Sequence, residues 1–381
     1  MDFSWSVDQE TLYRRVIDET RATLQPRVAR RGYDRWFERE EWRLCGEFGL
    51  LGLSVPGHYG GLGLDRLTTA RLMEAFGVAC EDMGLVFAAG AHLFACVMPI
   101  LEYGSDALKE RMLPKLCSGA WIGANAITEA GAGSDVFSLE ARAVREGETY
   151  VLDGTKTFVT NGPVADVIVV YATVNPAHGF LGITAFAVER ETAGVITELP
   201  FDKMGLASAP SGVVRLEACR VPATHRLGAE GQGGMVFNQS MQWERLGLFA
   251  GFVGMMERQL DVVVGHAAQR RQFRKRIGKY QAVSHRIADM KLRLESARLL
   301  LYRGCWLLDQ GQGGALDASL AKLAVSEASV RSSLDAIKIF GGAGYMTAAG
   351  IERGLRDAVA GTIASGTSEM QRDVIAAGLG L

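Results

Sequence analysis

The hydrophobic pattern of this chain is most pronounced in a long stretch without proline, from Gly233 to Met256. Its apolar residues recur at the spacing of a helix that is buried on more than one side. Only two residues of the stretch are charged, the adjacent Glu244 and Arg245. A carboxylate inside an apolar helix is costly unless it is paired or used, and burial raises its pKa. Glu244 is therefore either part of an ion pair to a neighbouring helix or a candidate general base.

The periodicity of the apolar residues divides the chain into three parts, residues 1–120, 121–230 and 231–381. The first part has helical spacing, including a helix over residues 40–55 that ends before Pro56. A later helix has Ser105 as its expected N-cap and Gly119 after its end. We expect an N-terminal helical domain here.

Short alternating runs separated by turns replace the helical spacing from about Trp121 onwards. Six or seven strands within about 100 residues predict a compact β-sandwich or barrel. Asp153 and Gly154 lie between two alternating runs, which predicts a hairpin turn at this dipeptide. After Gly231, long amphipathic segments with short connections predict an antiparallel four-helix bundle. The fold class is thus α+β, with the order helical, β, helical.

Composition narrows the functional classes. The chain has 381 residues, 48% of them hydrophobic, and a formal net charge of −2, which gives no case for nucleic acid or a membrane surface as partner. We expect no membrane span, because polar residues interrupt every apolar run before about 18 residues. The N-terminus lacks the basic start and apolar core of a signal peptide, so a cytoplasmic location is expected. The six cysteines form no CxxC pair and the six histidines no HExxH, which favours reduced core cysteines and no metal site.

Five motifs carry chemistry, and they occur in one order along the chain. They are AITEAGAGSD (126–135), DGTKTFVTNG (153–162), RRQFRKRIGKYQAV (270–283), IFGGAGY (339–345) and RDAVAGTIASGTSEMQR (356–372). Together with the helical–β–helical order, they resemble the acyl-CoA dehydrogenase family over essentially the whole chain. The resemblance implies an N-terminal helical domain, a middle β domain, a C-terminal four-helix bundle and FAD as the cofactor.

The resemblance also assigns residues to the flavin ring. Glycines let the backbone approach a flat ligand closely, and hydroxyl groups can donate hydrogen bonds to it. No GxGxxG follows a predicted strand, which disfavours a Rossmann site. The residues implied at the ring are Ile127, Thr128, Gly133 and Ser134, with Phe158 and Thr160 along its edge and face.

A second group of residues is implied at the pyrophosphate and adenosine parts of FAD. Arginine is suited to bidentate phosphate contacts, although the cluster RRQFRKR is also typical of a solvated basic helix end. Two positions depart from the family pattern: Lys338 stands where the family usually has Gln, and Arg274 where it has Gly. The implied residues are Arg270, Phe273 and Gln281 from a neighbouring subunit, Lys338, Gly341 and Gly342 at the pyrophosphate, and Thr367 and Glu369 near adenosine.

The family reaction is α,β-dehydrogenation of an acyl thioester, in which a base removes the α-proton. Most members carry this base just before the GT of the last motif, where this chain has Ser365. Serine cannot act as this base unaided. Members of the isovaleryl-CoA dehydrogenase type instead carry it on the first helix of the bundle, one residue before an arginine. That position is Glu244 here, so the resemblance implies Glu244 as the base and Arg245 as the residue that orients the site.

Several stretches look close to one branch, the L-prolyl carrier-protein dehydrogenases of pyrrole-forming pathways. This branch combines the relocated glutamate with serine before the GT. It implies oxidation of an L-prolyl thioester, tethered to an acyl or peptidyl carrier protein by phosphopantetheine, to a pyrrolyl thioester. The shared flavin contacts imply a homotetramer. The alternatives are a short branched-chain acyl-CoA dehydrogenase, a flavin-dependent monooxygenase of the same fold, and a non-catalytic protein that retains the fold.

Overall fold

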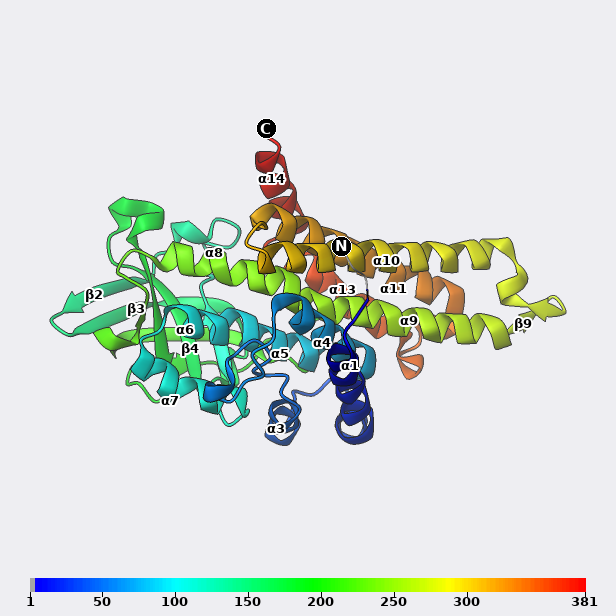
Figure 1. The fold of residues 1–381 in the computed structure, drawn as a ribbon, viewed down its shortest axis with the longest axis horizontal. Helices are drawn as coiled ribbons and strands as arrows, with labels where there is room; N and C mark the ends of the chain where they lie inside the picture. The colour runs from blue at the N-terminus through cyan, green and yellow to red at the C-terminus, as the bar shows by residue number, and fades with distance from the viewer. Residues whose placement is uncertain (1–3) are drawn as a thin grey trace.

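The structure is a computed structural model that describes residues 4–381, with a sheet at one end of its long axis and a helical bundle reaching to the other (Figure 1). The first part of the chain is helical and packs along the bundle. Its helices are α1 (Val7–Glu19), α2 (Gln25–Arg31), α3 (Arg39–Glu47), α4 (Arg66–Ala79), α5 (Met83–His92), α6 (Met98–Tyr103) and α7 (Asp106–Cys117). Ser105 caps α7 by accepting a hydrogen bond from the Leu108 N–H, as expected.

Two sequence expectations about this part are wrong. The helix expected over residues 40–55 ends at Glu47, because the chain turns into a left-handed conformation at Gly49 (φ +80°). The run Met83–Tyr103 is long and apolar enough by composition to cross a membrane, contrary to the expectation that no run would be. Yet 94% of its most apolar window is buried inside the protein, as in the core helix of a folded domain.

The middle part folds into one eight-stranded sheet with the strand order β6-β7-β3-β2-β4-β5-β8, and β1 pairs with β4 in parallel. β4 is buried along its whole length, and its alternate residues serve two different cores. Val167, Val169 and Tyr171 join the main core, whereas Ile168 and Val170 join a smaller core formed by residues of the middle part. The strands are β1 (Gly123–Ala126), β2 (Arg142–Glu146), β3 (Thr149–Thr160), β4 (Val167–Thr173), β5 (Ile183–Glu189), β6 (Val195–Thr197), β7 (Ser211–Pro222) and β8 (Arg226–Leu227).

The hairpin predicted at Asp153-Gly154 is wrong, because β3 continues through both residues. Its pairing with β7 shifts register between Leu152 and Gly154, so the dipeptide forms a bulge rather than a turn. A side chain at residue 154 would bring its Cβ within 2.5 Å of the Ala141 Cβ, which explains the glycine. The actual turn joins β2 to β3 at Gly147, whose φ is +63°.

The last part is the helical bundle. Its helices α9 and α4 approach closely through glycines, since a Cβ on Gly77 would lie 2.1 Å from the Gly251 carbonyl oxygen. At the end farthest from the sheet, β9 (Arg271–Gln272) and β10 (Lys275–Arg276) form a short hairpin between α9 and α10 (Figure 1). The helices are α8 (Gly233–Trp243), α9 (Phe249–Gln269), α10 (Gln281–Asp309), α11 (Ala315–Phe340), α12 (Gly342–Tyr345), α13 (Ile351–Gly361) and α14 (Ser368–Gly378). The predicted fold class, with its helical, β and helical parts, is confirmed.

Candidate active site

Glu244 lies where the first long helix of the bundle changes its winding. α8 ends at Trp243, residues Glu244–Leu248 form a π-helical turn, and α9 begins at Phe249. Such turns occur frequently at functional sites. Glu244 is only 9% exposed, and burial raises the pKa of its carboxyl group, while a hydrogen bond from Ser365 and the charges of Arg245 and Lys322 act in the opposite direction. The result is a buried carboxylate of increased basicity.

The structure places Ser365 against this carboxylate. The Ser365 hydroxyl donates a hydrogen bond to Glu244 Oε1, although 121 residues separate the two in the chain. Ser365 has φ +57° and the following Gly366 has φ +86°. The left-handed conformation is uncommon for a residue other than glycine. Sequence reasoning noticed Ser365 only as the absence of the usual carboxylate and so missed this contact.

Arg245 forms its hydrogen bonds with the Ser365 turn and with Ser319, not with an acidic side chain. Its Nε donates to the Ser365 carbonyl oxygen at 3.2 Å, and its Nη1 lies 3.4 Å from the Ser319 hydroxyl. Within residues 4–381, the side-chain hydrogen bonds of Glu244 and Arg245 go to Ser365 and Ser319, and neither residue forms an ion pair with a charged residue of another helix. The ion-pair interpretation of this dipeptide therefore finds no support in the described chain.

Lys322 is a second residue at the site that sequence reasoning missed. It is fully buried on α11, and its Nζ donates to the Gly366 carbonyl oxygen at 2.7 Å. Burial lowers the pKa of Lys322 to about 8, with a further lowering from Arg245. The neighbouring apolar and small residues in LAKLAV are the one sequence signal that this lysine does not face solvent.

A second π-helical turn, Leu93–Val97, lies opposite the first one. A Cβ on Gly247 would lie 2.3 Å from the Phe94 ring, so this glycine lets the two turns approach. Phe94 also stacks on Trp243 with 6.1 Å between ring centroids. The surroundings of Glu244 on this side are therefore apolar and closely packed.

The predicted flavin-ring residues Ile127, Thr128, Gly133 and Ser134 lie in the loop after β1, here called the flavin loop. A buried ion pair fixes the base of this loop. Lys156 Nζ on β3 lies 2.7 Å from Glu129 Oε1 and donates to the Ile127 carbonyl oxygen at 3.1 Å. The Thr157 N–H donates to the Thr128 carbonyl oxygen. Neither Lys156 nor Glu129 was among the predicted site residues. Gly133 and Ser134, by contrast, are exposed.

Phe158 and Thr160 lie at the end of β3 next to this loop. Phe158 has φ +55° within a register shift of the β3–β7 pair, and its side chain is 68% exposed. The Thr160 and Ser211 hydroxyls lie 3.4 Å apart. A bulge that turns an aromatic ring outward in an unfavourable backbone conformation suits contact with a flat ligand.

The residues predicted at the pyrophosphate lie far from the sheet, at the other end of the bundle (Figure 1). Phe273 and Arg274 form the two-residue turn of the β9–β10 hairpin, with φ +47° and +68°, and Phe273 is 88% exposed. Such a turn favours glycine, which gives a physical reason why Arg274 is the unusual residue. His266 stacks on Phe340 at 3.9 Å, so the ends of α9 and α11 lie together. This contact places Arg270 and Gln281 in the same region as Lys338, Gly341 and Gly342.

Thr367 and Glu369 directly follow the Ser365 turn, which contacts Glu244. Thr367 is the N-cap of α14 and accepts a hydrogen bond from the Met370 N–H. Glu369 is exposed in the first turn of α14. One chain thus separates the predicted cofactor residues into groups that it does not bring together.

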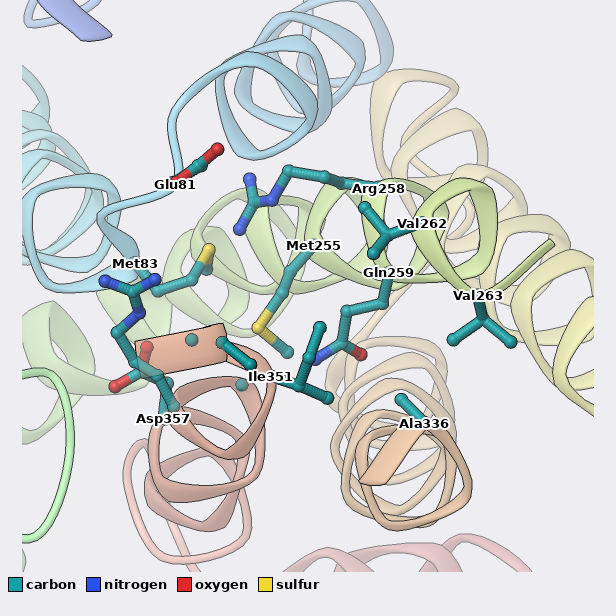
Figure 2. Close-up of a pocket in the computed structure, with 14 residues that line it drawn as sticks. Glu81, Met83, Met255, Arg258, Gln259, Val262, Val263, Ala336, Ile351 and Asp357 are labelled. Atoms are coloured by element: carbon teal, nitrogen blue, oxygen red, sulfur yellow. The ribbon is translucent and has the colours of Figure 1, made fainter. Parts of the chain in front are cut away.

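The described residues line cavities in two parts of the fold. One of about 180 Å³ lies between α9, α13 and the turn before α5, where Arg258 and Asp357 line it (Figure 2), and it contains none of the predicted site residues. Another, of about 610 Å³, is lined by residues 137–140 just after the flavin loop, together with Arg142, Thr173, Pro176 and Gly179. Of these two cavities, only the second is lined by residues that closely follow the predicted Ser134 in the chain.

Comparison with known proteins agrees with this arrangement. Models for the N-terminal, middle and C-terminal domains of acyl-CoA dehydrogenase match residues 6–120, 124–219 and 231–380. An L-prolyl-[peptidyl-carrier protein] dehydrogenase of Pseudomonas fluorescens is 56% identical over 90% of this chain and 91% of its own. The crystal structure of the prolyl acyl carrier protein oxidase AnaB has a TM-score of 0.96 at 44% identity, covering 99% of this chain and 100% of its own. PigA with FAD and proline has a TM-score of 0.95 at 41% identity, with both chains fully covered.

Proposed function

This chain belongs to the acyl-CoA dehydrogenase family, and from that premise we propose that it is an FAD-dependent dehydrogenase of a carrier-protein-tethered L-prolyl thioester. The product is the pyrrolyl-2-carboxyl thioester. The observation that carries the proposal is the buried Glu244 paired with Ser365, in a chain more than half identical to an enzyme named for this reaction.

The residues present fit FAD. The loop of Gly133 and Ser134 is open, since a Cβ on Gly133 would meet nothing within 4 Å, and Phe158 presents an exposed ring beside it. Thr128, Ser134 and Thr160 offer hydroxyl groups to a polar ring edge. When bound, FAD would supply the oxidising chemistry, as the hydride acceptor for the hydrogen on the substrate β-carbon. Arg270 and Lys338 offer positive charge to its pyrophosphate.

The protein's own contribution to the chemistry is proton abstraction. Glu244 takes the proton from the substrate α-carbon, and the C–H electron pair forms the new double bond as the β-hydrogen leaves. Conversion of prolyl to pyrrolyl removes four hydrogens, which corresponds to two successive two-electron oxidations. The first uses the only α-proton, so the second takes its hydrogens from other positions of the ring. Between the two, the reduced cofactor would have to pass its electrons to an acceptor such as oxygen.

We infer that the carrier protein delivers the substrate and that the enzyme works as a homotetramer in the cytoplasm. The distance between the flavin-ring residues and the Arg270 hairpin supports sharing of each cofactor between subunits. Exposed leucines on the outer bundle helices, Leu292, Leu299 and Leu334, support burial of this surface in an assembly. Light scattering of the holoenzyme measures the subunit number.

The six cysteines, all buried and unpaired within residues 4–381, suit a reducing compartment and support the proposed cytoplasmic location.

The substrate is tested by mixing the holoenzyme with L-prolyl carrier protein in the absence of oxygen and following flavin absorbance. We expect bleaching with the tethered prolyl group and none with isovaleryl-CoA. Bleaching by isovaleryl-CoA alone would reassign the protein to the branched-chain acyl-CoA dehydrogenases. Bleaching by neither would contradict the prolyl assignment and favour a monooxygenase or another carrier-bound acyl group.

A further inference from the structure

The turn at Ser365 and Gly366 combines backbone strain with an unusual number of side-chain contacts. Ser365 has φ +57°, a left-handed conformation that is unfavourable for a residue other than glycine. Three side chains from three helices bind its two carbonyl groups. Arg245 donates to the Ser365 oxygen, while Lys322 and Gln371 donate to the Gly366 oxygen at 2.7 and 3.0 Å. Strain of this kind persists only where the surroundings over-determine it, and it concentrates at functional sites.

The contacts of this turn fix one side chain, the Ser365 hydroxyl, and aim it at Glu244. The hydroxyl donates its hydrogen bond to Glu244 Oε1, and among residues 4–381 no hydrogen bond to Oε2 is present. One carboxylate oxygen is thus held while the other is free for the substrate proton. We propose that Ser365 is a positioning residue that holds Glu244 in its ionised, proton-accepting state, and this inference rests on the proposed role of Glu244 as the base.

The electrostatics agree with the geometry. A hydroxyl that donates to a carboxylate favours the charged form and lowers its pKa, whereas burial raises the pKa of Glu244. The other charged or titratable groups near Glu244 are Arg245 on the same turn, Lys322 on α11 and Tyr171 on β4. Both cations also favour the ionised form, but neither donates a hydrogen bond to Glu244 in the described chain. Ser365 is the direct contact.

The test compares Ser365→Gly with Ser365→Ala in the holoenzyme. Both remove the hydroxyl, but glycine accepts φ +57° without strain and alanine does not. We measure the rate of anaerobic flavin reduction by L-prolyl carrier protein as a function of pH. In both variants the acidic limb should move to higher pH by about one unit, as expected for loss of a hydrogen bond to a charged group. At pH values below the acidic limb, both variants should reduce the flavin about tenfold more slowly than the wild type. This difference should shrink at pH values above the limb.

Two further measurements separate this role from a structural one. Ser368→Ala is the matched control, because the Ser368 hydroxyl bonds Glu327 and not Glu244, and it should leave the limb unchanged. The infrared band of a protonated carboxyl group, identified by its absence in Glu244→Gln, should appear at higher pH in both Ser365 variants than in the wild type.

The outcomes distinguish failure of the inference about Ser365 from failure of the proposed role of Glu244. An unchanged limb and band in both Ser365 variants would overturn the inference while leaving Glu244 as the base. A shift in the alanine variant alone would also overturn it, because backbone strain would then be the cause. Flavin reduction at the wild-type rate in Glu244→Gln would instead overturn the assignment of Glu244 as the base.

Discussion

Glu244 and its neighbours show how one residue acquires its chemistry from burial. A carboxylate within the apolar interior costs free energy, and the same desolvation makes it a stronger base. The hydrophobic pattern singled out Glu244 as a candidate, because a lone charged dipeptide in an apolar helix is visible in one window, but only the family resemblance favoured a base over an ion pair. Ser365 and Lys322 were not selectable in this way, since their contacts join segments more than 40 residues apart.

At the residue scale, replacing Glu244 by Gln keeps the shape of the side chain but removes its basicity. We expect the variant to retain bound FAD and its thermal stability. Flavin reduction by L-prolyl carrier protein should slow by about 10²-fold to 10⁴-fold, the usual contribution of a general base. Anaerobic stopped-flow absorbance measures this rate. A rate within threefold of the wild type would show that another group takes the proton.

At the scale of elements, glycines set how closely the helices pack. α9 crosses α4 where Gly254 would bring a Cβ to 2.1 Å from the Glu74 carbonyl oxygen, whereas Gly265 on the same helix has nothing within 4 Å. No periodicity of apolar residues distinguishes these two glycines. The same limit explains the error at Asp153-Gly154, where the glycine avoids Ala141, the residue just before β2, rather than forming a turn. Sequence patterns gave the identity of most elements, but close approaches between elements depend on the tertiary fold.

The matched variants Gly254→Ala and Gly265→Ala test this packing. Gly254→Ala should lower the free energy of unfolding by about 1–3 kcal/mol, because the added methyl group has no space at the helix crossing. Gly265→Ala should leave stability equal or raise it by up to about 1 kcal/mol through helix propensity. Urea unfolding of the holoenzyme followed by circular dichroism measures both. Equal stability of the two variants would contradict the close crossing.

At the scale of the whole molecule, a buried polar junction joins the three parts of the chain. The loop after β6 reaches α13, where the Leu206 N–H donates to Asp357 Oδ1 at 2.6 Å. The same loop reaches α5, where the Ser208 hydroxyl donates to Asp82. Lys203 holds the loop by donating to the Leu206 carbonyl oxygen at 2.8 Å. Asp357 also lines the smaller cavity (Figure 2), which therefore belongs to this junction and not to the active site.

This junction predicts a pH dependence of stability. Burial raises the pKa of Asp357 to about 6 from 3.8, so the folded protein keeps a proton that the unfolded chain has released between these values. Stability from this group therefore falls as pH rises from about 4 to about 6, by at most about 3 kcal/mol. Asp357→Asn keeps an acceptor for Leu206 and should flatten this dependence. Unfolding at several pH values measures it, and the exposed Asp202→Asn is the control that should keep the wild-type slope.

The segment around the hairpin at the far end of the bundle provides a test of the predicted FAD pyrophosphate site. Arg270→Ala should raise the dissociation constant of FAD about tenfold or more, the effect of losing a hydrogen bond to a charged group. The ratio of flavin to protein absorbance after dialysis measures retention. Lys279→Ala removes an exposed cation of the same segment outside the predicted cofactor set and should retain FAD. Equal retention in both variants would place the pyrophosphate elsewhere.

The separation of the loop that carries Gly133 and Ser134 from the Phe273–Arg274 turn also has a consequence for how activity depends on protein concentration. With each cofactor shared between subunits, as proposed, occupancy of the site would follow the law of mass action for subunits as well as for FAD. Specific activity should then decline on dilution below the subunit dissociation constant, and added FAD should postpone the decline. Binding the cofactor and recruiting a second chain are in this sense one equilibrium.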